Sequence, residues 1–128
     1  MKTNVTLTIT SLLSILLVTF HLAGDIVLGY EKGGRSNLVA LPVLVVWLYG
    51  TLMLTGRRSG YIIMLLGSLL GSLVPWFHMS GKGLGFAVTN HGADVSFVWA
   101  TLAIGVTALF SVILSVRGLW SLRRTTPV

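Results

Sequence analysis

The sequence has no cysteine and very few acidic residues. Three of its 128 residues are Asp or Glu, and nine are Lys or Arg. The lack of cysteine excludes disulfides, zinc–thiolate sites, iron–sulfur clusters, thiol catalysis and haem attached through a CxxCH motif. Charged residues make up 9% of the chain, far below the roughly 25% found in soluble domains. Because 54% of the residues are also hydrophobic, a water-soluble fold is not expected.

Motifs that indicate catalysis are missing as well. There is no HExxH motif and no serine in a nucleophile elbow. The glycine-rich segment at residues 81–85 lacks the Gly-Lys-Ser/Thr ending of a phosphate-binding loop. No catalytic residue is predicted, and an enzyme is not the favoured class.

Four stretches without a charged residue are long enough to cross a membrane as helices. They cover residues 3–24, 36–56, 59–81 and 95–116, each near the roughly 20 residues that span a bilayer core. Helices are predicted over residues 5–27, 38–55, 60–79 and 95–116, with Pro42 near the start of the second and Pro75 in the last turns of the third. We therefore predict an all-α integral membrane protein, a bundle of four transmembrane helices that forms a single domain over residues 1–128.

The basic residues lie in the connections and near the chain ends. Placing both termini in the cytoplasm puts six of them inside and three (Lys32, Arg35 and Lys82) outside; the inner six are Lys2, Arg57, Arg58, Arg117, Arg123 and Arg124. This distribution follows the positive-inside rule and predicts a multi-pass protein of a plasma (inner) membrane. Topology therefore explains the net charge of +6. The lipid bilayer is the expected partner, and nucleic acid is not.

Small and polar residues recur on one face of three of the predicted helices. At 100° per residue, the shared faces are Thr10, Ser14, His21 and Asp25 in the first helix, Gly60, Gly67, Gly71 and His78 in the third, and Asp94, Thr101, Gly105 and Ala108 in the fourth. In membranes such faces turn toward other helices. The corresponding face of the second helix, through Trp47 and Gly50, carries no ionisable group.

If the three faces meet, His21, Asp25, His78 and Asp94 form one cluster near the outer boundary of the hydrocarbon, with His91 just above it. Each residue also has a simpler interpretation. Asp94 can cap a helix, His91 can lie solvated in the loop over residues 80–94, and His78 can lie at the headgroup level. Asp25 is harder to explain in this way, because a carboxylate near a helix carboxyl end opposes the dipole and needs a partner.

Imidazole and carboxylate groups together suit a divalent transition metal ion. The predicted metal ligands are His21, Asp25, His78 and Asp94, with His91 as a further candidate. The same groups suit proton relay. The most specific expectation is therefore cation or proton binding that serves transport or sensing, and a transporter of this size is expected to be a homo-oligomer.

Two alternatives remain open at this level. The chain can be an accessory or structural subunit that packs in a larger membrane complex, and the GxxxG match from Gly67 to Gly71 supports close helix packing. In the second alternative, His21 and His78 hold a b-type haem between two helices.

Overall fold

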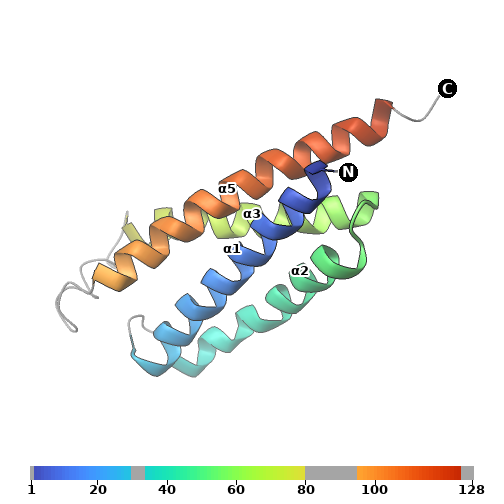
Figure 1. Ribbon diagram of the computed structural model, residues 1–128. Helices are drawn as coiled ribbons and strands as arrows, with labels where there is room; N and C mark the ends of the chain where they lie inside the picture. Colours follow the sequence, from blue (N-terminus) through green and yellow to red (C-terminus); the bar gives the residue numbers. More distant parts are fainter. Residues whose placement is uncertain (1, 30–33, 80–94, 125–128) are drawn as a thin grey trace.

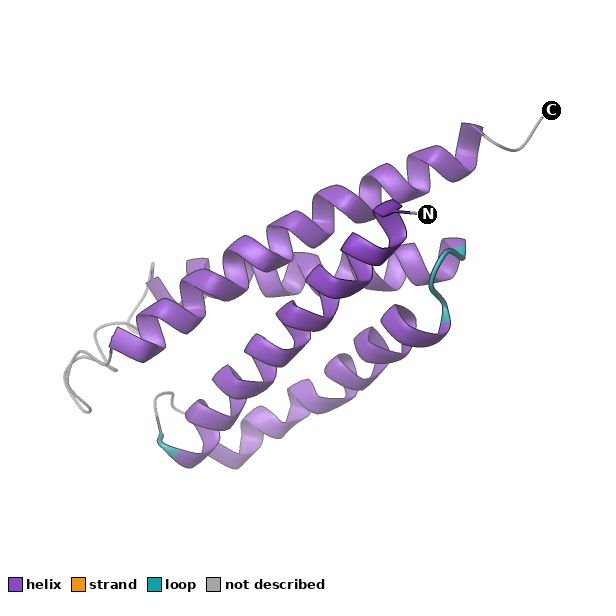
Figure 2. Ribbon diagram, in the orientation of Figure 1, coloured by secondary structure: helices purple, strands orange, loops and turns teal. Residues whose placement is uncertain are grey.

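The computed structural model describes residues 2–29, 34–79 and 95–124, and every structural statement concerns these residues. They form α1 (Lys2–Val27), the 3-10 helix η1 (Gly34–Ala40), α2 (Leu41–Met53), α3 (Arg58–Met79) and α5 (Val95–Arg124). Figure 1 and Figure 2 show long helices packed side by side, with no strand in the part of the chain described.

Four helical stretches are long and apolar enough to cross a membrane. They cover Asn4–Val27, Arg35–Met53, Arg58–His78 and Ser96–Arg124. The prediction of an all-helical chain with four helices of this length and composition is confirmed.

The second stretch differs from the predicted helix over residues 38–55. The 13 residues of α2 cover about 20 Å, less than the roughly 30 Å of a hydrocarbon core. The seven residues of η1 add about 14 Å. Pro42 is the second residue of α2, and its nitrogen has no hydrogen to continue a helical ladder back into η1. It is tolerated in the first turn of α2, where that hydrogen has no intrahelical partner.

The last helix is longer than predicted, since α5 continues past Val116 to Arg124. Its 30 residues cover about 45 Å. Near its end, the Arg124 guanidinium lies 5.3 Å from the centre of the Trp120 ring, a distance that permits a cation–π contact.

The helices form a bundle in which α1 and α3 each contact both α2 and α5. The helices α2 and α5 lie at opposite corners, without a contact between their described residues (Figure 1). The connection between α2 and α3 is tight, and Gly56 adopts a φ of 79° that favours glycine. The start of α1, the start of α3 and the end of α5 lie at one end of the bundle (Figure 1). The end of α1, the end of α3 and the start of α5 lie at the other end.

Small hydroxyl side chains occupy much of the interior. Ser11, Ser14, Ser68, Ser111 and Ser115 are all 0% exposed, whereas Leu, Val, Ile and Phe side chains cover most of the surface. Soluble bundles show the reverse arrangement. Small polar residues between helices are instead typical of packing in lipid.

Trp47 anchors α2 against its neighbours. Its indole N–H donates to Ser11 Oγ over 2.9 Å, and Ser11 Oγ lies 2.8 Å from Thr51 Oγ1. A Cβ atom added at Gly67 would collide with the indole, and one at Gly71 would lie 3.1 Å from Ala108 Cβ. The GxxxG segment therefore packs α3 against α2 and α5 within this chain.

Candidate metal centre

His21 and Asp25 lie one turn apart near the end of α1. Both are buried, with 8% and 5% of their surface exposed, and His21 Nε2 is 3.6 Å from Asp25 Oδ2. The helix ends soon afterwards, because Gly29 adopts a left-handed φ of 69°. Asp25 therefore lies near the negative end of the helix dipole, where a positively charged partner stabilises a carboxylate.

His78 approaches this pair from the last turn of α3. Its Nδ1 atom is 2.9 Å from the carbonyl oxygen of Val74. A carbonyl only accepts hydrogen bonds, so Nδ1 carries the hydrogen and donates it. In the neutral ring the lone pair is then on Nε2, which lies 3.2 Å from His21 Nε2. The backbone of α3 thus orients His78 with a potential metal-binding atom toward His21.

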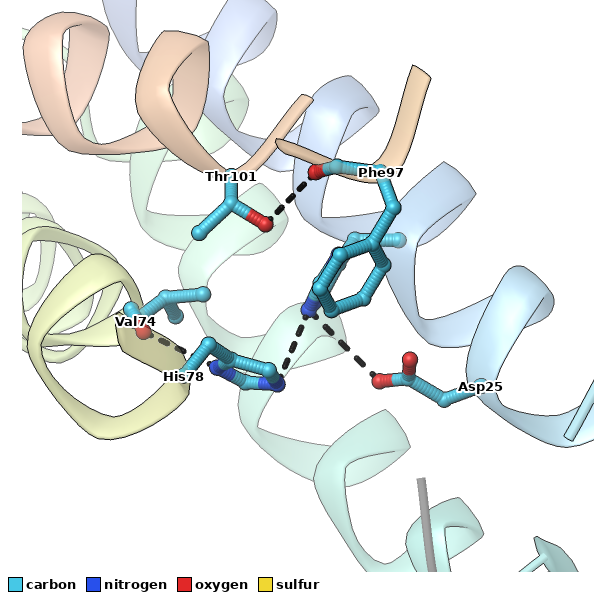
Figure 3. Close-up of polar contacts among 6 residues, drawn as sticks. Asp25, Val74, His78, Phe97 and Thr101 are labelled. Atoms are coloured by element: carbon cyan, nitrogen blue, oxygen red, sulfur yellow. Dashed lines mark hydrogen bonds and ion pairs between the residues drawn. The ribbon is translucent and has the colours of Figure 1, made fainter. Parts of the chain in front are cut away.

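Phe97 of α5 packs against both imidazoles. The centre of its ring is 5.2 Å from that of His21 and 5.8 Å from that of His78, and the side chain is 5% exposed. Its carbonyl accepts a hydrogen bond of 2.8 Å from Thr101 Oγ1 (Figure 3). Sequence reasoning missed Phe97, although it lies one turn before Thr101 on the predicted polar face of the helix. An apolar ring here shields the donor atoms from water, which strengthens electrostatic interactions among them.

Three of the predicted ligands come together. His21, Asp25 and His78 each offer one donor atom, and these atoms all lie within 4.8 Å of one another. Asp94 and the further candidate His91 lie outside the described residues.

Two of the three donor separations suit a small divalent ion, and all three donor atoms lie within 4.8 Å of one another. Tetrahedral coordination with bonds of about 2.0–2.1 Å places neighbouring donor atoms about 3.3 Å apart. The separations from His21 to the other two donors, 3.2 Å and 3.6 Å, are close to this value. Two imidazoles and one carboxylate also match ligand sets used for zinc and for non-haem iron(II), and they leave further positions open.

A haem between the two histidines does not fit this arrangement. Axial ligands bind iron from opposite faces of the porphyrin, which must therefore pass between the rings. Here the two Nε2 atoms are 3.2 Å apart, the rings meet edge to face with centres 4.7 Å apart, and Phe97 packs on both. With the rings in these positions, the two histidines would not bind one haem iron from opposite faces.

Comparisons with known proteins identify no relative for this chain. No protein-family model matches it, and searches of curated proteins and of solved structures find no match. Support for a function therefore comes from the geometry of His21, Asp25 and His78 itself.

Proposed function

We propose that the protein is a multi-pass membrane protein that binds a divalent transition metal ion through His21, Asp25 and His78, in the service of transport or sensing. The observation that carries this proposal is the convergence of three donor atoms from two helices, two of them on the buried residues His21 and Asp25 and one on the half-buried His78. The hydrogen bond from His78 to Val74 adds to it, because such contacts fix the orientation of a metal-binding imidazole.

Insertion into a membrane is supported by the four long apolar helices and by the small polar interior. The orientation follows from charge. Arg57, Arg58, Arg117, Arg123 and Arg124 belong to the end of the bundle opposite His78, so the positive-inside rule places that end in the cytoplasm. The metal centre then lies toward the outer side of a plasma membrane.

Metal analysis of the purified full-length protein tests the proposal. We expect about one Zn²⁺ or Co²⁺ ion per chain after dialysis, and a Co²⁺ absorption spectrum that indicates nitrogen and oxygen ligands. Replacing a metal ligand removes one of the few bonds that hold the ion. His21→Ala and His78→Ala should therefore abolish stoichiometric binding, and Asp25→Asn should weaken it.

Ser14→Ala is the matched control, because Ser14 is buried on the same helix and donates only to the Thr10 carbonyl. It should bind metal as the unmodified protein does. Equal binding by His21→Ala would refute the site. If the unmodified protein binds no metal, the next hypothesis to test is proton binding by the same three side chains. Proton flux into vesicles measures it.

Transport and sensing are separated by reconstitution. Vesicles with a zinc-sensitive dye inside should show uptake that depends on His21 if the ion crosses the membrane. Binding without uptake would favour a sensor.

A further inference from the structure

A concentration of positive charge lies at the end of the bundle away from the metal centre. Arg58 is the first residue of α3, and Arg123 lies in the last turn of α5. Both line one cavity of about 470 Å³ between the two helices; its other lining residues are Gly56, Ile62, Leu119 and Leu122. Two guanidinium groups from distant parts of the sequence thus share one concave surface.

This end of the bundle has no acidic side chain among its described residues. The three acidic residues of the sequence are Asp25, Glu31 and Asp94. Asp25 lies near the far end of α1, and the other two lie outside the described residues. A concave surface lined by charge of one sign concentrates ions of the opposite sign. The cavity therefore suits an anionic ligand.

The apolar residues that line the cavity indicate the chemistry of the rest of the ligand. Ile62, Leu119 and Leu122 are apolar, and Leu119 and Arg123 also line an adjoining cavity of about 380 Å³ with Val116 and Trp120. A free phosphate ion would make no use of these apolar surfaces. A molecule with a phosphate head and hydrocarbon chains would contact both kinds of surface.

The height of the cavity is consistent with such a ligand. Arg58–His78 is a stretch of 21 residues, about 30 Å of helix, which matches the thickness of a hydrocarbon core. If His78 lies at the outer boundary, Arg58 lies at the inner one. There it is level with lipid phosphates, and Ile62, one turn further into the bundle, is level with acyl chains.

We propose that this cavity binds an anionic phospholipid, with its phosphate between Arg58 and Arg123 and its acyl chains along Ile62 and Leu119. Guanidinium groups can form paired hydrogen bonds with phosphate oxygens. The lipid site rests on the membrane insertion proposed above, and it is independent of the metal centre.

Native mass spectrometry of the full chain released from nanodiscs tests the site. Discs contain phosphatidylglycerol and phosphatidylcholine with identical acyl chains. We expect one phosphatidylglycerol to stay bound in preference to phosphatidylcholine. Arg58→Gln and Arg123→Gln should each weaken its retention about fivefold. Inorganic phosphate at millimolar concentration should not displace it.

Arg117→Gln is the matched control, since it removes the same charge from α5 at a position that does not line this cavity. It should retain the lipid.

An equal loss in all three variants would show a general effect of net charge and refute the site. Equal retention of the two lipids, or displacement by inorganic phosphate, would also refute it. A chain that fails to enter nanodiscs refutes insertion, and with it the lipid site. Zinc binding by Arg58→Gln should stay unchanged, which separates this test from that of the metal centre.

Discussion

At the scale of single residues, several buried or half-buried polar side chains are held by specific hydrogen bonds. His78 donates to Val74, and the Trp47 indole donates to Ser11, which contacts Thr51. A buried donor left without an acceptor costs about 1–3 kcal/mol in water-soluble proteins and less in membranes. These bonds therefore hold particular rotamers in a bundle whose surface is largely apolar.

Replacing Ser11 by Ala should reduce stability by about 1 kcal/mol, because the Trp47 N–H loses its acceptor in a buried place. Thr19→Ala is the control: Thr19 is exposed on the same helix and donates to its own helix backbone at Ile15. Unfolding in a detergent titration, followed by tryptophan fluorescence, measures both changes. Equal stability of the two variants would show that the Trp47–Ser11 bond contributes nothing.

The residues of the candidate site were predictable to different degrees. The proximity of His21 to Asp25 follows from a spacing of four residues in a helix. The approach of His78 follows from the polar faces only if those faces meet, which the structure shows for α1 and α3. The role of Phe97 depends on how α5 rotates against two other helices. That rotation is set by packing between helices, and no local pattern encodes it.

At the scale of elements, the difference between what local residues encode and what they do not also explains which helix bounds could be predicted. The end of α1 at Val27 is marked by a local residue type, because Gly29 adopts a left-handed φ. The absence of charge predicted the apolar spans, but charge is a poor marker of helix ends. The α5 helix continues through Arg117, since arginine is a good helix former.

The contact between α2 and α3 is the element-scale feature most open to test. Gly67→Ala should destabilise the bundle by about 1–3 kcal/mol, because its methyl group would overlap the buried Trp47 ring. Gly71→Ala makes milder contacts, 3.1 Å to Ala108 Cβ and 3.3 Å to the edge of the Trp47 ring, and should cost less. Thermal unfolding in detergent ranks the two, and the reverse order would contradict this packing.

At the scale of the whole molecule, the two ends of the bundle differ in chemistry. One end carries His21, Asp25 and His78, and the other carries Arg58 and Arg123 at a shared cavity. A single orientation in the membrane is expected to follow from this difference, with the arginines inside.

The absence of cysteine allows this orientation to be measured directly. Ser36 in η1 and Ser59 in α3 are exposed at opposite ends of the bundle. A membrane-impermeant maleimide should label Ser36→Cys in intact cells, and Ser59→Cys only after the membrane is opened. The unmodified chain should not react. Labelling of Ser59→Cys alone in intact cells would reverse the proposed topology.

The diagonal placement of α2 and α5 has a consequence for evolution. The donor atoms and the covering Phe97 come from α1, α3 and α5, so α2 takes no part in the chemistry of the site. Selection on metal binding would act on three of the helices and leave α2 to drift, apart from the packing around Trp47. Homologues that share this activity should keep a histidine with an acid four residues later in the first span and a histidine at the end of the third. Their second span should diverge fastest.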